Sequence, residues 1–269
     1  MAAEEWAPTG ADLTTPNTAR IYDYLLGGKD NYDADRKVAE QLLKIIPESR
    51  MAARQNHLFI ARAVRFLVKE GVRQFIDIGT KLPARGNVHE VATELAPDAR
   101  VVFADSDPVV LSHARALLTG SSGSTLVTRA DLRRPETVAD DPQVRRLIDF
   151  DRPVAFILDR VLHFVEDTDE AAGVVGRLHA LLPPGGHLVF THITQEPRPD
   201  AGGDVGRVFQ PTSGFFWGRG RDEIERIVEA FELVEPGLTY TSQWRPEPGG
   251  EEIAFPERTY TLAGVGRRS

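Results

Sequence analysis

Before residue 72, hydrophobic residues recur every three or four positions, which is the period of an amphipathic helix. A first helix is predicted between the cap residue Asn17 and the stop at Gly27. Two longer helices are predicted over residues 34–46 and 48–70. Because all three helices precede the first predicted strand, we expect residues 15–71 to form an N-terminal helical cap. Residues 1–14 lack the pattern, and we expect them to be a flexible tail.

From residue 72 onward, short apolar runs alternate with helical segments, which indicates a mostly parallel sheet with right-handed crossovers. The predicted strands cover residues 74–78, 100–104, 125–128, 154–158 and 187–193. Two further strand-like runs, residues 233–240 and 259–265, follow without a helix between them and should pair antiparallel. We therefore expect residues 72–269 to form a doubly wound α/β sheet domain, in one structural unit with the cap. The Gly- and Pro-rich loop over residues 194–220 is either a lid or mobile.

Composition removes several classes of function. The 269 residues include no cysteine, so disulfides, thiolate metal sites and a cysteine nucleophile are excluded. The net charge of -8 gives no general attraction to nucleic acid or to anionic membranes. The longest apolar runs are too short to span a bilayer. Because the acidic N-terminus resembles no secretion signal, we expect a cytoplasmic protein.

Ligands of open α/β sheets bind beyond the carboxyl ends of the strands, so the turns after the predicted strands are the candidate site. Gly79, after the first strand, lets the backbone pass close to a ligand. Asp105, after the second strand, can accept both hydroxyls of a ribose. After the third strand, Asp131 can meet an exocyclic amine or cap a helix, and Leu132 can cover a purine. The Gly-x-Gly-x-x-Gly motif of dinucleotide sites does not follow the first strand. The Asp-x-Asp-Pro after the second strand, the Asp-Leu after the third and the terminal antiparallel strand pair favour the nucleoside of S-adenosylmethionine (SAM) instead.

The chain resembles an actinobacterial family of SAM-dependent methyltransferase-like proteins, formerly a domain of unknown function. Its longest signature is the string YDYLLGGKDNY from Tyr22 to Tyr32. Matching segments cover residues 17–32, 77–80, 86–91, 105–111, 161–165 and 243–246. The resemblance implies a class I methyltransferase fold with a seven-stranded sheet in the order 3-2-1-4-5-7-6.

The resemblance also implies roles for individual residues. Asp77, Gly79 and Thr80 would lie along the methionine end of SAM, and Asp105 would hold the ribose. Asp131 and Leu132 would frame the adenine, while the segment from Tyr22 to Tyr32 would close over the site.

Two positions depart from the family pattern, and both fall at the edge of the sheet that faces the cofactor. Lys81 stands where relatives usually have glycine, and Asp159-Arg160 stands where relatives are mostly apolar. A lysine cation beside the methionine end would repel the sulfonium of SAM but attract an anionic group.

Several further residues have both a structural and a functional interpretation. His163, after the fourth strand, is either a general base or a buried structural histidine. Tyr22, Lys29 and Tyr32 either contact the substrate or complete the cap, and Trp217 either lines the substrate pocket or belongs to a satellite core. His187 and His192 lie five residues apart on one strand and point to opposite faces, so we predict no metal site.

Three hypotheses for function remain open. The first is methyl transfer from SAM to a small molecule of actinobacterial secondary metabolism, with His163 or a tyrosine of the cap taking the proton. The second is a SAM-independent lyase or cyclase that binds an anionic group through Lys81 and Arg160, with Asp159 or His163 as base, for example in aziridine formation with loss of sulfate. The third is a non-catalytic partner subunit. A homodimer, or a complex with a partner or carrier protein, is compatible with each.

Overall fold

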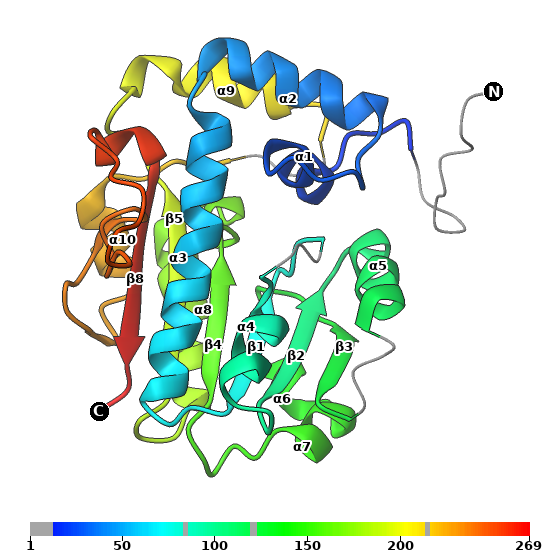
Figure 1. The fold of residues 1–269 in the computed structure, drawn as a ribbon, viewed down its shortest axis with the longest axis vertical. Helices are drawn as coiled ribbons and strands as arrows, with labels where there is room; N and C mark the ends of the chain where they lie inside the picture. The colour runs from blue at the N-terminus through cyan, green and yellow to red at the C-terminus, as the bar shows by residue number, and fades with distance from the viewer. Residues whose placement is uncertain (1–12, 83–85, 119–122, 213–215) are drawn as a thin grey trace.

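An eight-stranded sheet crosses the part of the chain that the structure describes, a computed structural model covering residues 13–82, 86–118, 123–212 and 216–269 (Figure 1). The strand order is β3-β2-β1-β4-β5-β8-β6, with β7 paired to β8. The strands are β1 (Gln74–Ile78), β2 (Arg100–Asp105), β3 (Thr125–Arg129), β4 (Ala155–Asp159), β5 (His187–Ile193), β6 (Glu232–Leu233), β7 (Thr239–Tyr240) and β8 (Thr261–Arg267). β1 to β5 are parallel, and β8 is antiparallel to its three neighbours.

This arrangement confirms the predicted fold, with one difference in the strand count. The run over residues 233–240 is not one strand but the two short strands β6 and β7. A turn separates them, in which Gly237 has a φ of 81° and donates its amide to the carbonyl of Val234 (2.9 Å). The last strand of the chain, β8, still lies between β5 and β6, as the predicted order requires.

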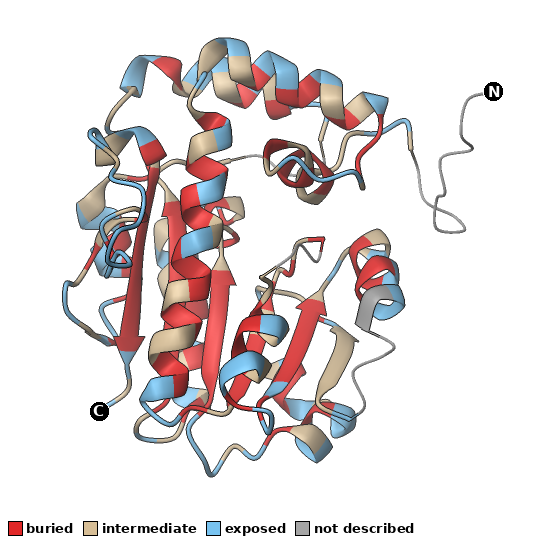
Figure 2. Ribbon diagram, viewed as in Figure 1, coloured by how far each residue is buried: buried red, intermediate tan, exposed pale blue. Residues whose placement is uncertain are grey.

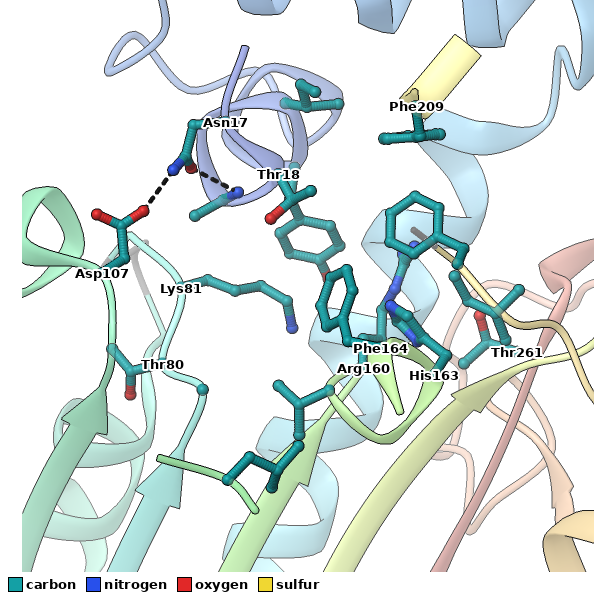
Figure 3. Close-up of a pocket in the computed structure, with 18 of the residues that line it drawn as sticks. Asn17, Thr18, Thr80, Lys81, Asp107, Arg160, His163, Phe164, Phe209 and Thr261 are labelled. Carbon is teal, nitrogen blue, oxygen red and sulfur yellow. Dashed lines mark hydrogen bonds between the residues drawn. The ribbon is translucent and has the colours of Figure 1, made fainter. Parts of the chain in front are cut away.

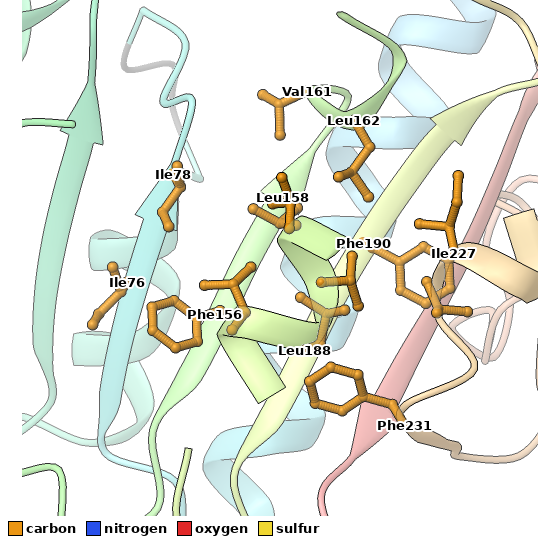
Figure 4. Packing of buried hydrophobic residues seen from close by; sticks show 14 of the residues in the cluster. Ile76, Ile78, Phe156, Leu158, Val161, Leu162, Leu188, Phe190, Ile227 and Phe231 are labelled. Atoms are coloured by element: carbon orange, nitrogen blue, oxygen red, sulfur yellow. The ribbon is translucent and has the colours of Figure 1, made fainter. Parts of the chain in front are cut away.

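Helices cover both faces of the sheet because each strand is apolar on both sides. Phe75, Val101 and Ile157 face one layer, which contains α3 (Ser49–Lys69), α4 (Val88–Leu95) and α5 (Pro108–Leu118). Ile76 and Phe156 face the other layer (Figure 4). The helices of that second layer are α6 (Glu136–Asp140), α7 (Pro142–Leu147), α8 (Thr168–Leu181) and α10 (Arg221–Ile227). Burial is accordingly highest along the central strands (Figure 2).

Three helices lie over the carboxyl ends of β1, β2 and β4, away from the two faces of the sheet (Figure 1). They are α1 (Thr18–Leu25), α2 (Asp33–Ile45) and α9 (Gly202–Phe209). Ile21, Leu42 and Phe209 belong to the hydrophobic cluster that joins them. α9 lies inside the segment that was predicted to be a loop, because its three glycines are unfavourable in a helix. Its apolar face packs on α2. The third helix of the predicted cap, α3, packs on a face of the sheet and not above its edge. The division of the chain into tail, cap and sheet domain stays a prediction.

Short one-turn helices complete the described chain. They are η1 (Leu162–Phe164), η2 (Pro199–Ala201) and η3 (Pro256–Thr259). Within the described residues, no helix is long and apolar enough to cross a membrane. The same residues contain no group of His, Asp or Glu side chains placed to hold a metal ion, and the predicted tail up to residue 12 lies outside the described part.

Candidate active site

A cavity of about 480 Å³ lies between the carboxyl ends of the strands and the helices above them (Figure 3). The turns after β1, β2, β3 and β4 form its floor, and α1 and α9 contribute to its roof. Predicted site residues that line it are Tyr22, Gly79, Thr80, Lys81, Asp105, Asp131, Leu132, Arg160, His163 and Trp217. The topology therefore brings most of the predicted residues to one place.

One half of the cavity has the chemistry of a nucleoside site. Gly79 has a φ of 76°, and a Cβ there would lie 2.1 Å from Val161 Cγ1, so only glycine fits the turn. Asp105 accepts the backbone amide of Asp107 (2.8 Å), and burial raises its pKa to about 7. Asp131 accepts the amide of Arg133 (2.9 Å), so its carboxylate orders the turn beside Leu132 as well as lining the cavity.

The cap is tied to this half by a contact that the sequence did not reveal. Asn17 caps α1 by accepting the amide of Ala19 (2.9 Å), and its side-chain amide donates to Asp107. Asp107 in turn caps α5 by accepting the amide of Val109 (2.8 Å). One hydrogen bond between two helix caps therefore fixes the start of α1 over the end of β2.

The other half of the cavity is lined by Lys81, which forms an ion pair with Asp159, a predicted site residue that is itself not part of the lining. The Lys81 side chain extends into the cavity from the turn after β1 (Figure 3), and its ammonium pairs with the Asp159 carboxylate and donates to the Asp159 backbone carbonyl (2.9 Å). Asn56 and Thr191 each donate to Asp159 Oδ1, both at 2.8 Å. Lys81 is therefore not a free cation in this structure, because a carboxylate from the neighbouring strand β4 compensates its charge.

Burial and neighbouring charge both shift the pKa values here. Burial lowers the pKa of Lys81 against the opposing pull of Asp159. Burial is the largest single effect on the pKa of Asp159 and raises it, but the Lys81 ammonium and the hydrogen bonds from Asn56 and Thr191 together lower this pKa below its ordinary value. Asp77 does not line the cavity; burial, reinforced by Asp159, raises its pKa to about 7.

Arg160 follows the pair directly and keeps its charge uncompensated. Its backbone φ of 56° is in the left-handed region, and its amide donates to Thr191 Oγ1 (2.9 Å). The guanidinium lies 5.1 Å from the centre of the Tyr22 ring, and Lys81 Nζ lies 4.6 Å from the same centre. Among the described residues, no carboxylate forms an ion pair with Arg160. The cavity thus contains a half-buried cation aimed at its interior.

His163 lies in the wall between the ion pair and an aromatic group. Its ring contacts Phe164 and Phe216, with ring centres 4.5 and 4.8 Å apart. Burial, with a contribution from Arg160, lowers its pKa well below the ordinary value of 6.5, so the imidazole is neutral at pH 7. Its Nδ1 atom is buried and has no hydrogen-bond partner among the described residues. A neutral imidazole can accept a proton, but the burial and the nearby cations that lower its pKa also make it a weak base.

A buried arginine that sequence reasoning missed holds the loop that carries His163. Arg219 is 2% exposed and donates to the carbonyls of Val165 (2.7 Å) and Glu166 (2.8 Å). It also lies 2.9 Å from His192 Nε2. The amide of Trp217 donates to the carbonyl of His163 (2.9 Å). No local pattern distinguishes Arg219 from surface arginines, because its partners are carbonyls far away in the sequence.

The surroundings of three predicted residues favour the structural interpretation over a substrate contact. Lys29 is exposed and does not line the cavity, because it lies in the turn between α1 and α2. Tyr32 is buried beneath Arg20, whose guanidinium lies 5.2 Å from the ring centre, and it also does not line the cavity. Tyr22 lines it, but burial raises its pKa and its hydroxyl donates to the carbonyl of Ala53 (3.0 Å). Such a phenol is a poor proton acceptor at neutral pH.

Comparison with known proteins agrees with this site. The model of the S-adenosyl methyltransferase family matches residues 4–269. The chain is similar to the crystal structure of a proposed methyltransferase from Thermobifida fusca, with 42% identity and a TM-score of 0.90 over 98% of this chain and 99% of that one. It is also similar to a DUF574 family protein from Streptomyces avermitilis, with 36% identity and a TM-score of 0.89 over 96% and 99% of the two chains.

A more distant structure shares the fold alone. The N-methyltransferase NodS from Bradyrhizobium japonicum, in complex with S-adenosyl-L-homocysteine, is 18% identical with a TM-score of 0.52 over 93% of this chain and 98% of that one. No curated protein matches the chain. From its family match and its two near relatives, the chain belongs to the S-adenosyl methyltransferase family and is a SAM-dependent transferase.

Proposed function

We propose that the enzyme transfers the methyl group of SAM to a small acceptor molecule beneath α1 and α9, and that His163 takes the proton which the acceptor loses. The observation that carries the proposal is the position of His163. Its neutral ring lines the cavity between the charged floor and the aromatic wall, with Nδ1 unpartnered among the described residues. The arrangement supports a general base that holds the proton only briefly, because its lowered pKa favours release of that proton at neutral pH.

The residues present fit the nucleoside of SAM. Gly79, where a Cβ would clash with Val161, lines the cavity with its backbone alone, Asp105 would hold the ribose, and Leu132 would cover the adenine with Asp131 at its edge. When bound, SAM supplies a methyl group that is already activated by its sulfonium. The protein's contribution is therefore mostly to orient the acceptor and to exclude water.

Apolar side chains of the cavity support a small, largely apolar acceptor. The wall beyond His163 contains Phe164, Phe209 and Phe216, and the ring centres of Phe209 and Phe216 are 4.2 Å apart. Trp217 lines the same region. A cavity with aromatic walls and a few convergent polar groups is typical of a small-molecule site.

The SAM-independent hypothesis loses one of its two cations. It requires both Lys81 and Arg160 to bind an anionic group, but Lys81 is paired with Asp159, and an anion that carries no ammonium of its own offers Asp159 no other partner to release Lys81. The same pair removes Asp159 as a free base, since its carboxylate already accepts from Asn56 and Thr191. Methyl transfer is therefore the better account, and a partner subunit without activity would have no use for the proton acceptor at His163.

The setting of the reaction belongs to the same proposal. Two near relatives come from Thermobifida and Streptomyces, which supports an origin of the family in actinobacteria. We place the enzyme in the cytoplasm, where its cofactor is made, and its acceptor in secondary metabolism. A homodimer or a carrier-protein partner stays a prediction.

The test is turnover by a His163→Gln variant. SAM and a panel of phenols, amines and carboxylic acids would be incubated with the enzyme, and S-adenosylhomocysteine formation measured. We expect turnover to fall about 10²–10⁴-fold, which is the usual contribution of a general base, while S-adenosylhomocysteine affinity changes less than about twofold. His89→Gln, a histidine outside the cavity, is the matched control. Turnover within a factor of about three of wild type would exclude His163 as the base.

A further inference from the structure

The order of the strands predicts which part of the cofactor meets the Lys81–Asp159 pair. The residues suited to adenine and ribose follow β3 and β2, whereas Lys81 follows β1 and Asp159 ends β4. Since β1 and β4 are the next two strands along the sheet, a nucleoside seated over β3 and β2 directs its 5′ substituent toward the pair. In SAM that substituent ends in an α-amino acid, which carries both an ammonium and a carboxylate.

The charges at this end of the cavity alternate in sign. The ammonium of Lys81 and the guanidinium of Arg160 both lie over the Tyr22 ring, and the carboxylate of Asp159 pairs with Lys81. A free amino acid presents the complementary pair of charges. Its ammonium needs a carboxylate, and its carboxylate needs a cation with several donors.

The members of this group differ in how firmly they are held. Asn56 and Thr191 fix the Asp159 carboxylate, and Thr191 also accepts the Arg160 amide. Lys81 has a flexible stem, is 18% exposed, and makes its two hydrogen bonds to Asp159 alone. Lys81 can therefore exchange its partner, whereas Asp159 cannot move without losing its other bonds.

We propose that Lys81, Asp159 and Arg160 form a clamp for the α-amino acid end of the cofactor. The ligand's ammonium takes the place of Lys81 on Asp159, and the released Lys81 turns with Arg160 to the ligand's carboxylate. This inference rests on the cofactor of the proposed function. A lone lysine at this position was expected to weaken the binding of SAM. In the clamp, Lys81 strengthens binding because it contacts the carboxylate of the amino acid end.

Calorimetry with two probes separates the clamp from the nucleoside site. S-adenosylhomocysteine contains the amino acid end, and 5′-methylthioadenosine has the same thioether nucleoside without it. Lys81→Met and Arg160→Met should each weaken S-adenosylhomocysteine about tenfold or more, the scale of one charged hydrogen bond. The affinity for 5′-methylthioadenosine should change less than about threefold, which also shows that the variants fold. Lys29→Met, which removes an exposed lysine outside the cavity, should leave both affinities unchanged.

Two outcomes would overturn the clamp. One is a Lys81→Met variant that binds S-adenosylhomocysteine as tightly as wild type or more tightly, which would make Lys81 an obstacle. The other is an equal loss of affinity for both probes, which would move the effect to the nucleoside. Neither outcome depends on the methyl acceptor, so a failure of the clamp and a failure of His163 as base are distinguishable.

Discussion

Two ion pairs among the described residues, one fully buried and one half-buried, have different surroundings. Arg20 and Asp35 join α1 to α2 (Nε to Oδ2, 2.8 Å), and their side chains are 1% and 0% exposed. Asp35 also accepts the amides of Asn17 (2.8 Å) and Tyr32 (2.9 Å). Lys81 and Asp159, by contrast, are 18% and 16% exposed, and Lys81 lines the cavity.

The difference separates a structural pair from one that can take part in binding. Backbone groups enclose the Arg20–Asp35 pair, since Arg20 Nη2 also donates to the carbonyl of Thr15 (2.6 Å). A ligand cannot enter such a pair without unfolding the cap. The Lys81–Asp159 pair is open on the cavity side, so a charged ligand can replace one member and compensate the other.

The largest effect is expected from opening the enclosed pair. Asp35→Asn leaves the Arg20 cation buried without its carboxylate, and such changes typically cost about 3–5 kcal/mol of the free energy of unfolding. Urea denaturation followed by circular dichroism would measure it. The double variant with Arg20→Met is the control, and it should recover part of the loss because no charge then stays buried. A cost below about 1 kcal/mol for Asp35→Asn would show that the pair is not enclosed.

The same comparison shows what the sequence could and could not predict. Arg20 and Asp35 flank the YDYLLGGKDNY signature, which the family resemblance implied would close over the site. Much of that signature is structural. Asp23 accepts the amide of Asp30 (2.9 Å) and the side chain of Asn31 (2.8 Å), and a Cβ on Gly28 would lie 2.0 Å from Asp23 Oδ1. A motif identifies residues that a fold needs, but it does not say whether they serve the turn or the ligand.

The sequence predicted the position of a residue where that position follows from the local pattern of strands and helices. Alternating strands and helices define a parallel sheet, and the sheet then brings Gly79, Asp105 and Leu132 to one edge. The sequence did not predict interactions between side chains that lie far apart along the chain. Asp159 was a candidate base and Lys81 a candidate anion site, but only the neighbouring positions of β1 and β4 make them one pair.

A smaller effect is expected from opening the exposed pair. Asp159→Asn should cost about 1–2 kcal/mol of the free energy of unfolding, because Lys81 can turn toward the cavity or lose its proton while Asn56 and Thr191 keep an acceptor. Urea denaturation of this variant beside Asp35→Asn gives the comparison directly. A cost for Asp159→Asn equal to or above that for Asp35→Asn would contradict the distinction between the two pairs.

The smallest expected effect is on the pH dependence of the free energy of unfolding, and it reports on the charges around the Lys81–Asp159 pair. Burial and the Asp159 carboxylate raise the pKa of Asp77 from 3.8 to about 7. The folded state therefore keeps a proton that the unfolded state releases near pH 4, so stability falls as pH rises from about 4 through about 7. Asp77→Asn cannot titrate, and its free energy of unfolding should fall less steeply than that of wild type. The difference should be about 1 kcal/mol between pH 6 and pH 7.

Urea denaturation at pH 5, 6 and 7 would measure this slope in both proteins. Asp105→Asn is an informative companion, because burial also raises the pKa of Asp105 to about 7 and its removal should flatten the slope again. In Asp159→Asn, the loss of the neighbouring carboxylate should bring the pKa of Asp77 closer to its ordinary value and shift the fall in stability to lower pH. Identical slopes in wild type and Asp77→Asn would mean that Asp77 is already ionised near the ion pair. Lys81 and Arg160 would then lower the pKa of Asp77 more than their positions indicate.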